Sequence, residues 1–202
     1  MPRKSVTISC TQSPIYLPWE KLSAAERHRE IIRHAERRQG YAVTVNLKPE
    51  YEEYLHSQTK PMRIVGKRMN AALNHLDLRE LPVLMVLEAT RSEGRLHLHG
   101  VYLDRGYGKP RIQEAMRRAT GYIPGRSGSR QFCSKRITAA DGWDNYLRKD
   151  CRSTKRFLNL ASDGRLWWVS RPMTQVARDE YEAIRLGHAP AANLNNSLLS
   201  VS

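Results

Sequence analysis

Two histidines separated by one residue, His97 and His99, have the type and spacing of metal ligands. They lie in the segment 95–103, where apolar and polar residues alternate as in a half-buried β-strand. Side chains on a strand point to alternate faces, so both imidazoles project from the same face. Neutral imidazole is a common ligand of divalent metals. The pair therefore predicts half of a metal site.

The preceding apolar segment, 83–89, supplies a candidate third ligand, Glu88. If Thr90 faces Arg95 across a short turn, the two segments form a hairpin in which Glu88 lies opposite His97. A slip of one residue would move the carboxylate to the other face, and a buried carboxylate without a partner is costly. We therefore expect the carboxylate and both histidines to converge. This mixed ligand set suits Mn²⁺ or Mg²⁺, and also Zn²⁺.

A second candidate group lies in the segment 138–149, which is predicted to be a helix. Tyr146 and Lys149 are three residues apart, so they share one face of that helix. A phenol becomes a useful nucleophile when a nearby cation or metal favours its ionised form. The alternative is that Trp143, Tyr146 and Leu147 are only the buried stripe of an amphipathic helix.

Elements that could position these residues follow from periodicity and from helix and turn signals. In chain order we expect a basic helix 23–40, a strand 41–47, a helix 61–77, the hairpin 83–103, helices 110–119 and 138–149, a strand 165–171 and a helix 174–186. This order predicts an α+β fold in which helices pack on a central antiparallel sheet. We divide the chain into an N-terminal extension (1–40), one domain (41–187) and a disordered tail (188–202).

The charge of the chain predicts a polyanionic partner. The 202 residues carry a net charge of +14, and arginine greatly outnumbers lysine. Residues 105–156 contain 14 Lys and Arg but only 4 Asp and Glu. Arginine-rich chains also come from GC-rich genomes, but this clustering favours nucleic acid, because guanidinium groups bind phosphate bidentately. The candidate nucleic-acid contacts are Arg95, Lys109, Arg111, Arg117, Arg118, Arg126, Arg130, Lys135, Arg136, Arg148 and Arg152, with Tyr107, Tyr122 and Trp143 as candidates for stacking on bases.

Several classes of protein are disfavoured by what the sequence lacks. Cys10, Cys133 and Cys151 are too widely spaced for a metal knuckle and odd in number, so we expect free thiols in a reducing cytoplasm, that of a bacterial host. No phosphate-binding loop of the GxxxxGK[ST] type occurs, so we expect no nucleotide cofactor. We find neither a signal peptide nor an apolar run of membrane-spanning length, and we expect no membrane association.

These motifs together resemble those of the HUH endonucleases, named for their His-hydrophobe-His motif, and in particular the single-tyrosine rolling-circle replication initiator (Rep) proteins. Residues 41–47 resemble the first motif of the family, a strand of the central sheet. His97-Leu98-His99, with Glu88 upstream, resembles the metal-binding motif, and Tyr146-Leu147-Arg148-Lys149 resembles the Tyr-x-x-Lys motif that carries the nucleophile. The resemblance covers about residues 41–170 and implies an RRM-like sheet.

The resemblance also implies a reaction. His97, His99 and Glu88 would hold one divalent cation, Tyr146 would attack the scissile phosphate to give a 5′-phosphotyrosine and a free 3′-hydroxyl, and Lys149 would neutralise nearby charge. The covalent link conserves the phosphodiester energy, so the DNA could be rejoined without ATP. The implied substrate is single-stranded DNA at the replication origin of a plasmid, phage or other mobile element. A separate host or element helicase would unwind the duplex.

Four alternatives remain at this stage. Within the same superfamily, the chain could be a single-tyrosine transposase or, less consistently with the order of its motifs, a relaxase. It could also be a metal-dependent nuclease that uses water and forms no covalent adduct. Outside the enzymes, it could be a non-catalytic nucleic-acid-binding protein whose histidines are ordinary core residues.

Overall fold

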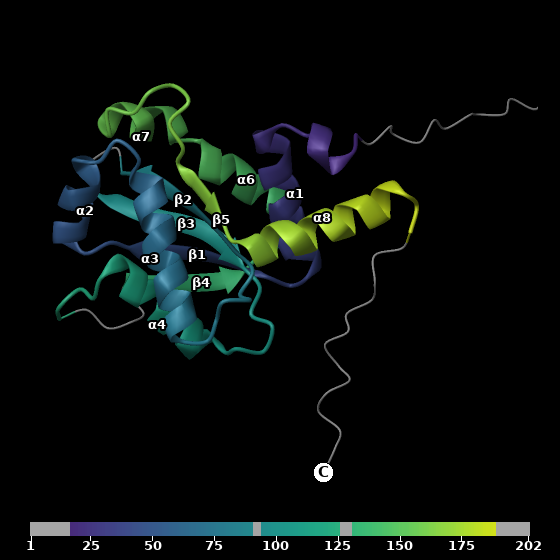
Figure 1. The fold of residues 1–202 in the computed structure, drawn as a ribbon, viewed down its shortest axis with the longest axis horizontal. Coiled ribbons are helices and arrows are strands. Elements are labelled where there is room, and N and C mark those ends of the chain that lie inside the picture. The colour runs from purple at the N-terminus through teal and green to yellow at the C-terminus, as the bar shows by residue number, and fades with distance from the viewer. Residues whose placement is uncertain (1–16, 91–93, 126–130, 189–202) are drawn as a thin grey trace, which may run out of the picture.

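A central sheet with helices on both faces forms the body of the protein (Figure 1). The computed structural model describes residues 17–90, 94–125 and 131–188. The described elements are η1 (Trp19–Lys21), α1 (Ala24–Arg37), β1 (Tyr41–Asn46), α2 (Pro49–His56), α3 (Pro61–His75), β2 (Val83–Ala89), β3 (Leu96–Tyr102), α4 (Lys109–Thr120), β4 (Phe132–Arg136), α6 (Ala140–Arg148), α7 (Cys151–Phe157), β5 (Trp167–Val169) and α8 (Arg171–Arg185). The predicted α+β class is confirmed.

The sheet has five antiparallel strands in the order β4-β1-β3-β2-β5. The strand with the histidines, β3, is therefore central, and every residue of β2 and β3 is buried. The predicted hairpin register is confirmed, since Glu88 pairs with His97 and the Thr90 amide donates to the carbonyl of Arg95 over 2.9 Å. A carboxylate and two imidazoles thus share one face of a rigid sheet.

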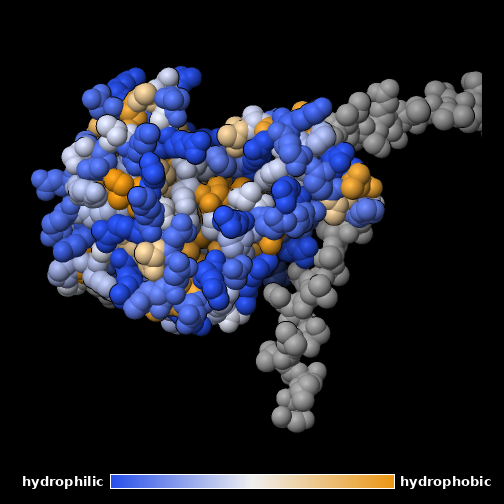
Figure 2. Space-filling model, in the orientation of Figure 1, coloured by the Kyte–Doolittle hydropathy of each residue, from blue (hydrophilic) through white to orange (hydrophobic). Residues whose placement is uncertain are grey.

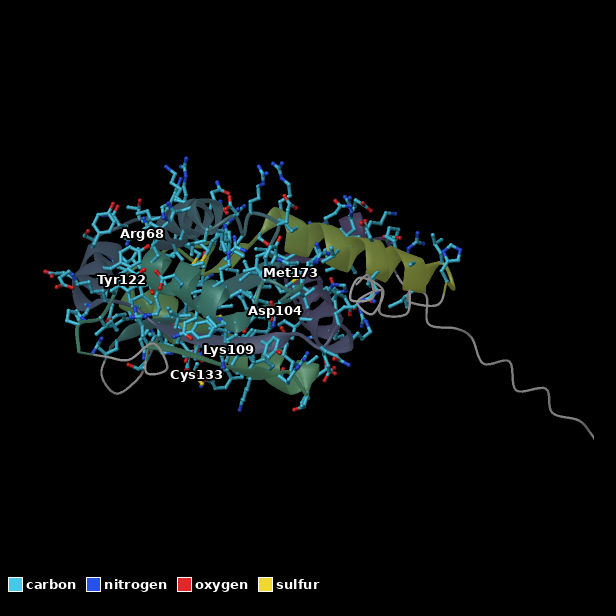
Figure 3. All side chains as sticks on the ribbon, turned by 90° about the horizontal axis from the view of Figure 1, so that it is seen from below. Arg68, Asp104, Lys109, Tyr122, Cys133 and Met173 are labelled. Atoms are coloured by element: carbon cyan, nitrogen blue, oxygen red, sulfur yellow. The ribbon has the colours of Figure 1, made fainter. Side chains whose placement is uncertain are left out.

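Adjacent tryptophans of β5 show which helices cover each face. Trp168 projects toward α3, where it packs on Gly66 so closely that an added Cβ would lie 2.5 Å from the indole. Trp167 projects from the other face and stacks on His28 of α1, with 4.3 Å between ring centroids. Helix α3 also packs against α4. Figure 3 shows Arg68 of α3 and Cys133 of β4 on opposite sides of the sheet.

Helix α1 begins with the capping box that its sequence predicts. The Ser23 hydroxyl accepts from the Glu26 amide, and the Glu26 carboxylate accepts from the Ser23 amide. The apolar side of the helix contributes Ile31 and Ile32 to the same core as the sheet. It also packs against α6 and α8. This helix therefore packs as part of the body of the fold.

The last strand and the last helix differ from the sequence-based expectation. We expected a strand over 165–171 and a helix from Thr174, but β5 spans only Trp167–Val169 and α8 begins at Arg171. The cause is Ser170, whose hydroxyl accepts from the Met173 amide and so starts the helix early. Helices α2 and α7 were not predicted, because each is short and begins directly after another element.

Two expectations drawn from composition concern cysteines and membranes. Cys133 and Cys151 are free thiols in the structure, while Cys10 lies outside the described residues. The predicted tail, 188–202, lies almost entirely outside the described residues as well. None of the helices in the described part of the chain combines the length and apolarity needed to cross a bilayer.

Candidate metal centre and adjoining tyrosine

Glu88, His97 and His99 form a buried cluster that could bind a metal ion. Within the described part of the chain, each offers one ligand atom, and these atoms lie within 4.8 Å of one another. Glu88 Oε2 is 3.4 Å from His99 Nε2, and Glu88 Oε1 is 3.8 Å from His97 Nε2. The two imidazole rings are nearly perpendicular, at 88°. The donors thus converge on one point from two hydrogen-bonded strands.

The surroundings of His99 favour a metal ligand over an imidazolium. Burial, together with its neighbours His97 and Lys149, lowers the pKa of His99 to about 4. The ring is therefore neutral at physiological pH, the form that binds metals. Its Nδ1 lies 2.8 Å from the Thr44 hydroxyl on β1. When Nδ1 carries the proton and donates to Thr44, Nε2 presents its lone pair to the cluster, as in many metal sites.

The predicted nucleophile adjoins this cluster. The Tyr146 hydroxyl on α6 lies 3.5 Å from His99 Nε2. The Lys149 ammonium lies 3.6 Å from the centroid of the Tyr146 ring and 3.8 Å from Glu88 Oε1. The helix thus brings the phenol and the ammonium together with the carboxylate and imidazole of the sheet. Four residues proposed from two separate motifs lie in one site.

The ring of Tyr146 is held between two side chains of its own helix. Trp143 stacks on it with 4.9 Å between ring centroids and 5° between the planes, while Lys149 lies over the ring. The Trp143 indole N–H donates to the carbonyl of Gly100 on β3, at 3.2 Å. The indole therefore links the tyrosine to the strand that carries the histidines and restricts where the hydroxyl can move.

A buried carboxylate fixes α6 against α1. Asp144 is 1 % exposed and accepts from Arg148 Nε at 2.8 Å and from Arg29 Nε at 3.2 Å. A buried carboxylate needs such partners, because its desolvation is costly. Arg148 also donates to the carbonyl of Ala25, again on α1. These bonds set the position of the helix that carries Tyr146.

Some of the predicted nucleic-acid contacts lie on the side of the sheet that carries the cluster. Lys135 on β4 pairs with Ala42, which shares the face of Thr44 and His99. The side chain of Lys135 is exposed, and so is that of Arg152 on α7. Arg95, in contrast, is bound bidentately by Glu52, and Arg148 is held in the contacts described above.

Other predicted contacts lie away from the cluster or outside the structure. Lys109, Arg111, Arg117 and Arg118 belong to α4, which packs against α3 beyond the opposite face of the sheet. Two predicted base-stacking groups, Tyr107 and Tyr122, flank that helix rather than the metal cluster. Arg136 donates to the carbonyl of Gln39 and lies over the Tyr41 ring. Arg126 and Arg130 lie outside the described residues.

Three residues of the site were not assigned these roles from sequence. Thr44 was part of a predicted strand, but its pairing with His99 depends on β1 lying beside β3. Asp144 and Arg29 are 115 positions apart, so no local pattern links them. One signal was available, because Asp144 and Arg148 have the helical i, i+4 spacing of an ion pair.

Comparison with known proteins adds nothing to this description of the site. No protein-family model, no curated protein and no solved structure matches the chain.

Proposed function

We propose that this protein cuts and rejoins single-stranded DNA, using Tyr146 as the nucleophile beside a divalent metal held by Glu88, His97 and His99. The observation that carries the proposal is the 3.5 Å distance between the Tyr146 hydroxyl and His99 Nε2. Packing of the Tyr146 ring in the core would not by itself place the hydroxyl beside a cluster that could bind a metal. The proposal agrees with the resemblance to HUH replication initiators, and the initiation of rolling-circle replication is the cellular role that we assign.

The donor set fits a divalent cation. One carboxylate and two imidazoles suit Mn²⁺ or Mg²⁺, with Zn²⁺ as a further candidate. With three protein ligands in the cluster among the described residues, coordination positions would remain for substrate oxygens. When bound, such a cation supplies Lewis-acid polarisation of a non-bridging oxygen of the scissile phosphate.

The residues of the chain have separate tasks in the reaction. The Tyr146 hydroxyl loses its proton and its oxygen attacks phosphorus, so that a phosphotyrosyl bond forms and the bond to the 3′ oxygen breaks; the 3′ oxygen takes up a proton and leaves as a 3′-hydroxyl. Lys149, beside both the ring and Glu88, stabilises the negative charge that develops on the phenol oxygen. Trp143 keeps the ring in place. The reverse attack by a 3′-hydroxyl restores the phosphodiester.

Single-stranded DNA is the proposed substrate because of the charge and shape of the protein. The chain carries a net charge of +14, which favours a polyanion. The phosphate to be cut must reach a site on the face of a sheet beside a helix, and a single strand can be drawn there more readily than a rigid duplex.

Covalent capture tests the proposal directly. The protein is incubated with labelled single-stranded oligonucleotides and with either Mn²⁺ or EDTA, and denaturing gels then show whether DNA migrates with protein. Tyr146→Phe removes only the nucleophilic oxygen, and Tyr54→Phe, at an exposed tyrosine of α2, is the matched control. We expect a Mn²⁺-dependent adduct with wild type and Tyr54→Phe, and none with Tyr146→Phe.

Two other outcomes would replace this function with an alternative. Cleavage that persists in Tyr146→Phe without an adduct would indicate a metal-dependent nuclease with water as the nucleophile. If DNA is retained but neither cleaved nor attached, on an oligonucleotide pool that includes the element's own origin, the protein would be a non-catalytic binding protein.

A further inference from the structure

A cavity lies between α3, α8 and the edge strand β5, away from the cluster of Glu88, His97 and His99. It encloses about 750 Å³, and its walls include Leu73 of α3, Val176 of α8 and, from β5, Trp168. Figure 2 shows apolar side chains gathered in this region within a mostly hydrophilic surface. Pockets of this size hold small ligands or single residues of a polymer.

The cavity and the candidate metal-binding cluster of Glu88, His97 and His99 are separate sites. Trp168 pairs with Met85 on β2, and Glu88 lies three residues further along the same strand, which is about 10 Å at the rise of a β-strand. Met85 and Glu88 also project from opposite faces of the sheet. A ligand in the cavity therefore cannot touch the cluster through the sheet.

Three arginines give the rim of the cavity its charge. Arg79, Arg105 and Arg171 line it, against one carboxylate, Glu80. All three arginines are exposed, and within the described residues none of their guanidinium groups forms an ion pair or hydrogen bond. Most other arginines around the sheet, such as Arg148, are engaged with carboxylates or carbonyls. This set of cations is therefore free to bind an external anion.

The aromatic wall indicates what kind of anion fits. Trp168 is only partly buried, and its indole N–H has no hydrogen-bond acceptor among the described residues. Tryptophan provides a flat surface on which nucleobases of any sequence stack. Arginine binds phosphate through its planar fork. An indole wall within a rim of arginines matches a base with its flanking phosphates.

We infer that this cavity is a second binding site for single-stranded DNA, in which a base stacks on Trp168 and the adjoining phosphates pair with Arg79, Arg105 and Arg171. The choice of DNA as the polymer rests on the proposed function. An acidic peptide is the competing occupant, but it would leave the flat indole without a stacking partner. A strand bound here is held at a distance from the nick, so the cavity acts in retention and not in chemistry.

Equilibrium binding in EDTA tests this site without any cleavage. The probe is a fluorescent thymidine oligonucleotide of about 12 nucleotides. Its binding is measured by fluorescence anisotropy at salt concentrations from about 50 to 200 mM. The cavity variant is Arg79→Gln/Arg171→Gln. The matched control, Arg63→Gln/Lys67→Gln, removes the same charge from exposed positions of α3 that do not line the cavity.

We expect the cavity variant to bind roughly tenfold more weakly at about 100 mM salt, and its slope of log affinity against log salt to fall by about 1.4, or 0.7 for each phosphate that is no longer neutralised. The control should change affinity less than about twofold. Trp168→Ala should also weaken binding by about fivefold or more, whereas Trp168→Phe retains a stacking surface. Circular dichroism checks that each variant is folded.

Three results would overturn the inference. Equal losses in both double variants would mean that only net charge matters, and unchanged binding in the cavity variant would mean that DNA does not contact the cavity. If a poly-glutamate peptide binds wild type but not the cavity variant while DNA binding stays the same, the site takes an acidic protein. The binding assay does not require Tyr146, so a failure of covalent capture would not affect its result. Likewise, a failure of the cavity variants to weaken binding would not contradict covalent capture.

Discussion

Gly100→Ala is a severe test of how the hairpin holds the site together. Gly100 follows His99 on β3 and lies opposite Met85 on β2. A Cβ at this position would lie 2.0 Å from the carbonyl oxygen of Leu84 and 2.8 Å from the sulfur of Met85. The sulfur can move with its side chain, but the carbonyl belongs to the neighbouring strand. The two central strands would have to separate.

The size of the effect follows from that separation. Ordinary contact begins at 3.4 Å, so β2 and β3 must move apart by about 1.4 Å, which stretches neighbouring inter-strand hydrogen bonds beyond bonding distance. Each buried backbone group left without a partner costs about 1–3 kcal/mol. Loss of even one inter-strand hydrogen bond leaves a donor and an acceptor without partners and would therefore cost at least about 2 kcal/mol, a substantial part of the 5–15 kcal/mol typical of a domain.

Urea unfolding followed by far-UV circular dichroism measures this loss. Gly142→Ala in α6 is the control, since its added Cβ would meet only the Cβ of Ala139, at 3.7 Å, and replacing glycine in a helix should stabilise by up to about 1 kcal/mol. At temperatures where Gly100→Ala remains folded, its affinity for Mn²⁺ should also fall, because Glu88 moves away from the histidines. A urea midpoint equal to that of wild type would refute the argument.

Three further predictions concern the metal, the tyrosine and pH. Mn²⁺ at about 100 times its dissociation constant should stabilise wild type by about 2.7 kcal/mol, and thermal unfolding should show no such gain after His97→Ala; an equal gain would exclude the cluster as the site. Trp143→Ala should slow adduct formation by Tyr146 by about 10- to 100-fold, whereas Trp143→Phe, which retains the stacking but loses the hydrogen bond to Gly100, should give an intermediate rate; equal rates for all three proteins would exclude a positioning role. Burial and the nearby Arg148 lower the pKa of His28 to about 4, from 6.5. The unfolded chain then binds the extra proton, so stability should be lost as pH falls from about 6.5 towards 4, and His28→Phe, which preserves stacking on Trp167, should make urea unfolding less dependent on pH in that range.

The cluster of Glu88, His97 and His99 could be predicted from sequence because its geometry is local. A hairpin has few registers, and only one places Glu88 on the face of His97 and His99. A buried carboxylate in an apolar strand needs a partner, and this requirement selects the hairpin register in which Glu88 lies opposite His97. Tyr146 and Lys149 were also paired correctly, because helical spacing alone determines that they share a face.

The contacts between elements could not be predicted in the same way. Helical spacing places Trp143 beside Tyr146, but nothing in the sequence shows that the indole would donate to the carbonyl of Gly100 on β3. That contact depends on how α6 crosses the sheet. Likewise, counting charges along the sequence put the basic residues of α4 in one group with Lys135, although the sheet separates them. A charge count does not show on which face of the sheet each residue lies.

The distance between Tyr146 and the cluster is therefore a tertiary property, set from outside the motifs themselves. Helix α6 is held near its centre by two adjacent residues: Asp144 joins it to Arg29 of α1, and Trp143 joins it to β3. Helix α1 in turn packs its apolar side into the shared core. Substitutions that leave the candidate metal ligands and the tyrosine intact but release either attachment should thus impair the proposed reaction without preventing metal binding. The two motifs supply the groups to which we assign the proposed reaction, and the packing of α6 between α1 and the sheet brings them into one site.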